Sequence, residues 1–265
     1  MQVMEAAVAA NPWPLRRERA AELAERYPHA TEMLRLYSAL TLVQEKALQV
    51  IPPSSDVAEF AAQHVIPGIV DVTVEAGPPV LRDGVIEAFC SADLVELVQT
   101  WLDGESLTPF ETYLARASAS PILEALSVSP SPLAGEGRGG GSSTKCPNCG
   151  GLPQLSYFAV SGEALVSGPR YLVCSRCANN WVFSRMTCAG CGESTGTKLP
   201  IYQEQERFPH IRVDGCQTCR KYLLTFDLRR DTRAVPIVDE IAALPLDLFA
   251  RNQGLTKITP NLMGN

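Results

Sequence analysis

Eight cysteines in the second half of the chain form four Cys-x-x-Cys pairs, here called hooks. The hooks are Cys146/Cys149, Cys174/Cys177, Cys188/Cys191 and Cys216/Cys219. A shift of 42 residues places the first two hooks on the last two at all four cysteines, which indicates an internal duplication of one unit. Four thiolates that converge on one point form a closed tetrahedral site for Zn²⁺ or Fe. The sequence therefore predicts two four-cysteine metal centres.

The hooks can be paired in two ways. Pairing within each unit leaves 24 residues between the two hooks of both units, which suits a knuckle, strands and a returning knuckle. A cross-brace would instead join Cys146/Cys149 to Cys188/Cys191. We favour sequential pairing, because a tandem duplication copies a complete site.

Residues next to the hooks suggest how the knuckles fold. Gly150 and Gly192 directly follow the first hook of each unit, where glycine relieves the strain of a positive φ. Arg170 and Arg212 also lie 42 residues apart, so they either touch the charge of the centres or are solvated. His210 is expected to be packed or solvated, because eight cysteines already fill two tetrahedra. The cysteines alone do not separate Fe from Zn.

The cysteine count and the start of the chain indicate a reducing compartment. The nine cysteines are an odd number, and in a cytosolic protein paired cysteines hold metal far more often than they form disulfides. Residues 1–11 lack the basic and apolar regions of a secretory signal, and no stretch reaches about 18 apolar residues. We therefore expect a cytoplasmic protein that does not insert into a membrane. The ninth cysteine, Cys90, is predicted to be a small buried hydrophobe.

The net charge of -6 is unevenly distributed. From residue 145 onward 14 Lys and Arg accompany 10 Asp and Glu, whereas residues 1–144 hold 9 and 19. Two divalent ions on eight thiolates would bring the C-terminal half to about zero. The basic side chains of that half are thus poor evidence for a nucleic-acid surface, and we expect no nucleic acid as a partner.

The N-terminal half shows helical periodicity throughout. Apolar residues recur at helical spacing, and Pro, Ser and Thr mark the ends of segments. Helices are predicted over 15–27, 30–51, 57–66, 92–102 with Ser91 as its N-cap, and from Thr108-Pro109 to about 126. Residues 1–126 are therefore predicted to be an all-helical domain.

The rest of the chain is predicted to be a linker and a small-β domain. Residues 127–144 are rich in Ser, Pro and Gly, which is typical of a flexible linker. In 145–265 short β-prone segments alternate with the hooks, as in rubredoxins and zinc ribbons, at 155–160, 170–173, 181–184, 198–202 and 222–228. Trp181 is predicted to shield a site. The tail 237–253 has a helical stripe that Pro245 interrupts, so a kinked or split helix is expected. The fold class is thus α+β.

No phosphate loop, nucleophile elbow or acid/base pair is present in the sequence, so we do not expect an enzyme.

Several runs around the hooks resemble the formate dehydrogenase accessory protein FdhE family. They are KCPNCGGLP at 145–153, RYLVCSRC at 170–177, CAGC at 188–191, CQTCRKYL at 216–223 and AALPLDL at 242–248. The resemblance implies a helical N-terminal domain, two rubredoxin-like metal sites and a cytoplasmic role in maturing formate dehydrogenase. The implied partner is the catalytic subunit, which carries the molybdopterin cofactor.

Three functions remain in competition. The first is a metal-binding maturation factor that docks on an apo-enzyme subunit. The second is a nucleic-acid-binding zinc ribbon, which the charge distribution disfavours. The third is a rubredoxin-like electron carrier that uses iron at the same cysteines.

Overall fold

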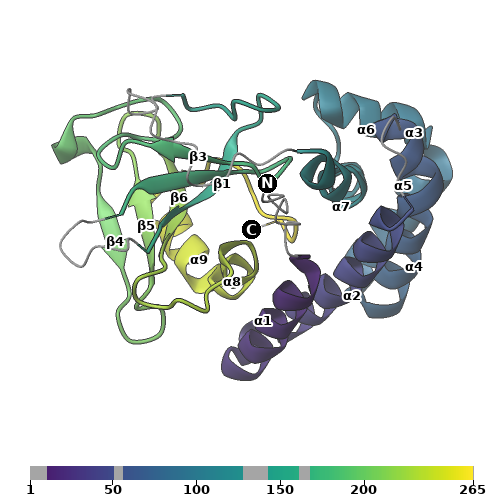
Figure 1. Cartoon of the computed structure of the whole chain (residues 1–265), viewed down its shortest axis with the longest axis horizontal. Coiled ribbons are helices and arrows are strands. Elements are labelled where there is room, and N and C mark those ends of the chain that lie inside the picture. The colour runs from purple at the N-terminus through teal and green to yellow at the C-terminus, as the bar shows by residue number, and fades with distance from the viewer. Residues whose placement is uncertain (1–10, 51–55, 128–142, 161–167, 265) are drawn as a thin grey trace, which may run out of the picture.

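The structure, a computed structural model, describes residues 11–50, 56–127, 143–160 and 168–264. A helical half precedes a half built on one sheet, and Figure 1 shows the helices to the right of the sheet. The predicted α+β class is confirmed. Residues 128–142 of the predicted linker lie outside the described residues, so the division into 1–126, 127–144 and 145–265 stays a prediction.

The helices of the helical half largely follow the predicted segments. Their bounds are α1 (Trp13–Arg26), a 3-10 turn η1 (Pro28–Ala30), α2 (Thr31–Leu48), α3 (Val57–Phe60), α4 (Ile66–Ala76), α5 (Pro79–Ser91), α6 (Leu94–Asp103) and α7 (Pro109–Leu126). Helix α7 begins as predicted, because Thr108 and Glu111 form a capping box around its first turn.

Three details of the helical half differ from the prediction. Asp93 rather than Ser91 caps α6, because its carboxylate accepts hydrogen bonds from the first backbone N–H groups of the helix. Ser91 instead ends α5, a helix that the sequence reading did not place. The helix predicted at 57–66 continues through a π-turn (Ala61–Val65) into α4. Pro67 has no N–H to donate, so the hydrogen-bond ladder is reset there.

The continuous helical segment Val57–Ala76 is long and apolar enough to span a membrane by length and composition, which the sequence reading did not anticipate. Half of its most apolar 18-residue stretch is buried inside the protein, with Ile66 and Ile69 fully covered by neighbouring helices. Burial of this kind is typical of a core helix. Among the residues that the structure describes, no other helix passes the same test.

The sheet displays the 42-residue duplication as two copies of an antiparallel three-stranded unit. Its strands are β1 (Pro153–Phe158), β2 (Arg170–Cys174), β3 (Asn180–Phe183), β4 (Ile201–Gln203), β5 (Ile211–Gly215), β6 (Lys221–Asp227) and β7 (Thr256–Lys257). The order β3-β2-β1-β6-β5-β4 sets the first copy beside the second, joined by the parallel pairing of β1 with β6. The sequence predicts all of these strands except β5 and β7.

The tail forms two helices, α8 (Pro236–Ala242) and α9 (Leu244–Asn252). The split falls at Ala243, two residues before Pro245, as the tail sequence predicts. One hydrophobic core joins α1 and α2 to the sheet and to both tail helices. In Figure 1 the tail helices lie between the sheet and α1. The helical half and the sheet half are therefore packed together, whatever the conformation of residues 128–142.

Candidate metal centres

The structure brings the eight hook cysteines together in two groups of four. The first cysteine group is Cys146, Cys149, Cys174 and Cys177, and the second is Cys188, Cys191, Cys216 and Cys219. In each group one hook precedes a three-stranded unit, and the other forms the turn between the second and third strands of that unit. The hooks are thus grouped within units, and the cross-brace is not observed.

The sulfur atoms are spaced as a tetrahedral metal site requires. All ligand atoms of a group lie within 4.8 Å of one another. The Sγ–Sγ distances are 3.8 Å for Cys146–Cys177 and 3.4 Å for Cys149–Cys174. In the second group the corresponding pairs are 3.7 Å and 3.8 Å apart. Metal–sulfur bonds of about 2.3 Å imply sulfur separations of about 3.8 Å in a tetrahedron, so either group could hold Zn²⁺ or Fe.

None of the nine cysteines, all of which lie within the described residues, forms a disulfide. Cys90 lies outside both groups and its side chain is exposed, so the prediction of a buried Cys90 is wrong. It sits on the outer face of α5, whereas Val85 and Ala88 face the core of the helical half.

Every hook is followed by a residue in the left-handed region. Gly150 and Gly192 have φ of +70° and +79°, as predicted from the strain of the turn. Ala178 and Arg220 take the same conformation after the second hooks, with φ of 53° and 59°. A non-glycine residue pays a steric cost there, of about 1–2 kcal/mol. All four hooks therefore use the same backbone turn, although only two of them carry the glycine that signals it.

Hydrogen bonds to sulfur differ between the groups. In the first group the side-chain amides of Asn148 and Asn179 donate to the sulfurs of Cys177 and Cys146, at 3.6 Å and 3.7 Å. A backbone N–H also donates to Cys174 at 3.4 Å. In the second group the N–H of Gly190 donates to Cys188 at 3.3 Å. Donors of this kind stabilise thiolate charge, which favours metal binding.

In each group the surroundings lower the pKa of one cysteine, Cys177 in the first and Cys216 in the second. Hydrogen bonds from the Cys149 and Cys174 thiols hold the pKa of Cys177 far below its usual range. The same contacts, with burial, raise the pKa of Cys174. In the second group burial opposes ionisation of Cys216, but hydrogen bonds from the backbone N–H groups of Cys219 and Thr218 lower its pKa overall.

The first group is enclosed by both halves of the protein. Trp181 is buried beside it and donates from Nε1 to the backbone of Ser143, as expected for a shielding aromatic. Arg176, inside the second hook, donates to the carbonyl of Leu102 at 2.9 Å and stacks over Trp101 of α6. Asn148 donates to Ser127, at the end of α7. The first group is therefore clamped to the helical half.

The second group lies nearer the surface. Cys191 is exposed, and the other three cysteines are buried or half-buried. Ile258 of the tail packs over this side, since a Cβ on Gly190 would meet Ile258 at 3.3 Å and the sulfur of Cys219 at 3.6 Å. Glu193 bonds Thr218 at 2.6 Å, so a carboxylate ties the two hooks together. The hydrogen bond from Thr218, followed by hydrogen bonds from Thr195, lowers the pKa of Glu193 to about 2.

Arg170 and Arg212 form ion pairs with one carboxylate, that of Asp214, at 3.2 Å and 2.8 Å. No hydrogen bond from either arginine to a cysteine sulfur is present in the described part of the chain. They are thus neither sulfur donors nor fully solvated.

His210 is packed rather than solvated. Its Nε2 lies 3.3 Å from Asp239, and Asp231 is close enough for the three residues to form a possible ligand set. Arg19 of α1 already donates to both carboxylates, at 2.5 Å to Asp239 and 2.8 Å to Asp231. The Arg19 guanidinium occupies the place that a metal ion would take. The contacts of Arg19 with the two carboxylates therefore join α1 to the tail.

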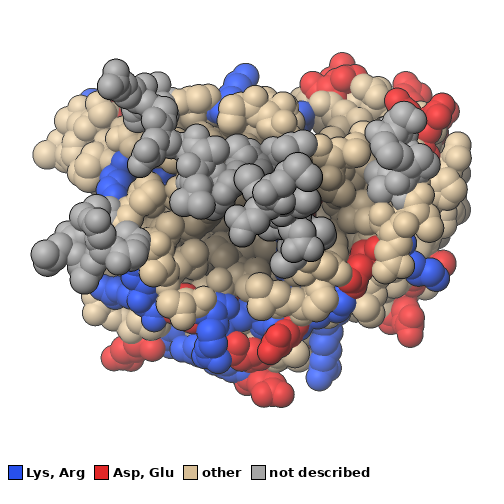
Figure 2. Space-filling model, viewed as in Figure 1, with Lys and Arg blue, Asp and Glu red and all other residues tan. Residues whose placement is uncertain are grey.

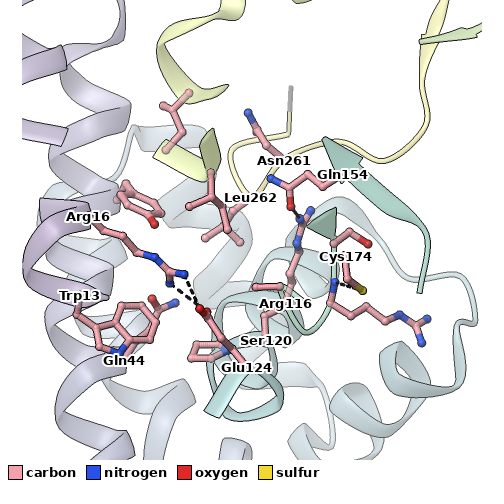
Figure 3. Close-up of a pocket in the computed structure, with 17 residues that line it drawn as sticks. Trp13, Arg16, Gln44, Arg116, Ser120, Glu124, Gln154, Cys174, Asn261 and Leu262 are labelled. Carbon is pink, nitrogen blue, oxygen red and sulfur yellow. Dashed lines mark hydrogen bonds and ion pairs between the residues drawn. The ribbon is translucent and has the colours of Figure 1, made fainter. Parts of the chain in front are cut away.

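A cavity of about 70 Å³ lies between the two halves, next to Cys174. Among the residues that line it, Figure 3 shows Arg16 and Glu124 pointing toward each other and Arg116 pointing toward Gln154. Burial lowers the pKa of Arg116 to about 10.

Gln154 continues this contact into a buried network. It donates to Glu240, which pairs with Lys257 at 2.7 Å. Lys257 also pairs with Asp247, which accepts from Tyr222 at 2.9 Å. A charged network therefore runs from the cavity to β6, the strand that follows the last hook.

Comparison with known proteins agrees with this arrangement. The model of the FdhE central domain matches residues 145–185, and that of the FdhE C-terminal domain matches residues 186–263. The boundary between the two matches falls between the two cysteine groups. The chain belongs to the FdhE family.

Relatives in the family match either the cysteine half or most of the chain. A protein FdhE homolog from Aquifex aeolicus is 35% identical over 119 residues, which cover 45% of this chain and 41% of that protein. A homolog from Stutzerimonas stutzeri is 28% identical over 94% of this chain and 88% of its own length. The crystal structure of the FdhE protein from Pseudomonas aeruginosa shares the fold, with a TM-score of 0.67 and 23% identity over 95% of this chain and 94% of that one.

Proposed function

We propose that this chain is a cytoplasmic, non-catalytic accessory protein of formate dehydrogenase, with one metal ion, Fe or Zn, in each cysteine group. It binds the catalytic subunit that carries the molybdopterin cofactor and supports the formation of active enzyme. The observation that carries this proposal is the pair of four-cysteine groups within the stretch that matches the two FdhE models. The family name links that stretch to formate dehydrogenase.

The bound ions would fix the hook turns, which lie at the ends of the strands. An ion in either group cross-links two turns that are separated by 24 residues. The binding free energy of such an ion, about 10–16 kcal/mol in zinc-finger peptides, is also folding free energy. Residues of this chain would then fix the surface that meets the partner, since Asn148 and Arg176 tie the first group to α6 and α7.

A rubredoxin-like electron carrier is the second candidate, and the exposure of Cys191 favours it. An electron donor or acceptor must approach a centre closely, and the second group lies at the surface. Metal analysis of protein purified anaerobically from its own cells separates the candidates. Zn at both groups would exclude electron transfer, whereas Fe at the second group would support it.

Gene deletion and complementation test the accessory role. Deletion should lower formate dehydrogenase activity and leave the transcript of the enzyme unchanged. The variant Cys146→Ser/Cys149→Ser should fail to restore activity, because it removes half of the ligands of the first group. Cys90→Ser is the matched control, since this exposed cysteine belongs to neither group, and it should restore activity fully. Full restoration by the double variant would refute the proposal that the metal site matters.

A pull-down from formate-grown cells tests the partner. The wild-type chain and the Cys90→Ser control should both retain the catalytic subunit, as identified by mass spectrometry, and the double variant should lose it. Loss of activity with normal retention of the subunit would move the role of the metal from docking to a later step. Retention of no formate dehydrogenase subunit by the wild-type chain would contradict the proposed partner.

A further inference from the structure

Phe158, at the end of β1, is surrounded by arginines from three separate elements. The guanidinium carbons of Arg185, Arg212 and Arg229 lie 4.9, 4.8 and 5.5 Å from the centre of its ring. One aromatic ring thus supports three positive charges by cation–π contact. Neither the metal groups nor the core contacts of the two halves require this arrangement.

The cluster is not neutralised by its neighbours. Arg212 shares the Asp214 carboxylate with the buried Arg170, and Arg229 pairs with Asp227 at 2.6 Å. Arg185 donates to the backbone carbonyl of Gly168, which carries no net charge. Arg230 donates to the carbonyl of Pro209 and shares the Asp227 carboxylate with Arg229, at 3.9 Å. Among the described residues, two carboxylates, those of Asp214 and Asp227, therefore face five guanidinium groups. These belong to Arg170, Arg185, Arg212, Arg229 and Arg230. This local excess of three positive charges stands on a chain whose net charge is -6.

A cavity of about 180 Å³ opens beside Phe158, and its lining includes Gln203, the carboxylate of Asp227 and three arginines, Arg212, Arg229 and Arg230. Arg185 contacts Phe158 but does not line the cavity. The three arginine side chains are 26%, 39% and 50% exposed, so they are reachable from solvent while their ion pairs hold them in place. Figure 2 shows Lys and Arg side chains gathered along the lower rim of the sheet half. Clustered like charges repel one another, and a set of held guanidinium forks is suited to bind carboxylates.

The cavity lies next to an edge of the sheet. Strand β4 is the last strand in the order and pairs with β5 alone among the described strands. Gln203 of β4 is directly opposite Arg212 of β5, so their side chains share one face. The outer backbone groups of an edge strand are free to pair with an extended peptide. A peptide backbone on β4 would therefore place a side chain near the arginines.

We propose that the arginine cluster around Phe158, formed by Arg185, Arg212, Arg229 and Arg230, is a docking site for an acidic segment of a partner polypeptide. An Asp or Glu carboxylate of the segment enters the cavity, and its backbone runs along β4. A nucleic acid is disfavoured, because its further phosphates would meet a chain of net charge -6. The site contains none of the hook cysteines, so a failure of this proposal would leave the proposed function untouched, and the reverse also holds.

The test uses the full chain with a fluorescein-labelled hexaglutamate peptide as probe, followed by fluorescence anisotropy at low and physiological salt. Arg229→Gln/Arg230→Gln should weaken binding at least tenfold. The matched control Arg207→Gln/Arg233→Gln also removes two positive charges, from residues that are 65% and 71% exposed and do not line the cavity. It should weaken binding less than threefold. Arg212→Gln, on β5, changes another arginine that lines the cavity. It should also weaken binding, and it provides an independent variant if the double variant unfolds, as circular dichroism would reveal.

Two small competitors identify the occupant. Free glutarate carries the carboxylates without a backbone, and it should compete only at concentrations at least 100-fold above hexaglutamate. Inorganic phosphate should compete no better than glutarate. The proposal is overturned if hexaglutamate does not bind, if the control pair weakens binding as much as the cavity pair, or if phosphate or glutarate binds as tightly as the peptide.

Discussion

The two cysteine groups descend from one duplicated unit, yet they are embedded in the molecule differently. The first lies between the sheet and the helical half, where Trp181 and Leu123 pack against its cysteines. The second lies at the surface, with Cys191 exposed and the tail residue Ile258 as its cover. Both copies have three antiparallel strands and the same left-handed turns after their hooks, so the difference lies mainly in the side chains around the ligands.

Positions that are equivalent after the 42-residue shift show how the copies diverged. Asn179, which donates to a sulfur in the first group, corresponds to Lys221 in the second. Arg176, which binds α6, corresponds to Thr218, which binds Glu193. At the second of these positions the first copy directs its side chain toward the helical half, whereas the second copy directs it within its own knuckles. We infer that the first group mainly holds the two halves together, and that the second is free to serve the surface.

Removing one ligand from each group tests this contrast with the largest expected effect. Cys174→Ser and Cys216→Ser change equivalent residues, and each should lower the metal content from two ions to one. Only Cys174→Ser should also raise hydrogen exchange in α6 and α7, because those helices contact the first group. Metal analysis with hydrogen-exchange mass spectrometry checks both results. Equal protection of α6 and α7 in the two variants would contradict the division of roles.

Lys257→Met tests the anchor of the tail that covers the second group. Lys257 is buried between Glu240 and Asp247, whose side chains are fully covered. Its removal leaves two buried carboxylates without a positively charged partner, although Gln154 and Tyr222 still donate to them, and should lower the free energy of unfolding by about 3–5 kcal/mol.

Burial raises the pKa of Glu240, so that a falling pH lets this carboxyl take up a proton in the folded state. The decrease in the free energy of unfolding caused by Lys257→Met should therefore be smaller at pH 6 than at pH 8. Urea denaturation at both values measures it, with the exposed Lys46→Met as control. A loss that grows as the pH falls would argue against an unpaired Glu240.

Asn179→Ala should bring the two groups closer in metal affinity. The variant loses an N–H donor to the sulfur of Cys146, and contacts of this kind are worth about tenfold or more in affinity. A chelator competition should show the first group weakened about tenfold and the second unchanged. The neighbouring Asn180→Ala, an exposed residue of β3, should change neither. Weakening of both groups by Asn179→Ala would indicate a general loss of structure.

The smallest effects are expected at the left-handed residues. Ala178→Gly should stabilise the metal-loaded protein by about 0.5 kcal/mol, because the relief of steric strain exceeds the added entropy of glycine. Gly192→Ala should destabilise it by about 1 kcal/mol. Thermal unfolding with saturating zinc measures both changes. A destabilising Ala178→Gly would mean that the methyl group of Ala178 packs usefully against the first group.

The sequence by itself determined the features that repeat or alternate locally. The spacing of the hooks predicted two groups of four cysteines, because a metal site needs ligands that the chain returns to one point. Thr108-Pro109 predicted the start of α7, and Pro245 predicted the split of the tail, because capping and proline act within a few residues. The left-handed residues Ala178 and Arg220 are not glycines, so their residue type does not indicate the turn. Their position directly after a hook, like that of Gly150 and Gly192, is the signal that could have predicted it.

Only the tertiary structure decided which residues meet across the chain. Arg19 reaches Asp239, 220 positions away, and Arg176 reaches Leu102, so neither contact leaves a periodic trace in the sequence. The exposure of Cys90 depended on which face of α5 packs inward, and the three arginines around Phe158 depended on the pairing of β1 with β6. Local patterns fix turns and periodicity, whereas burial and charge clusters arise when distant segments are packed together.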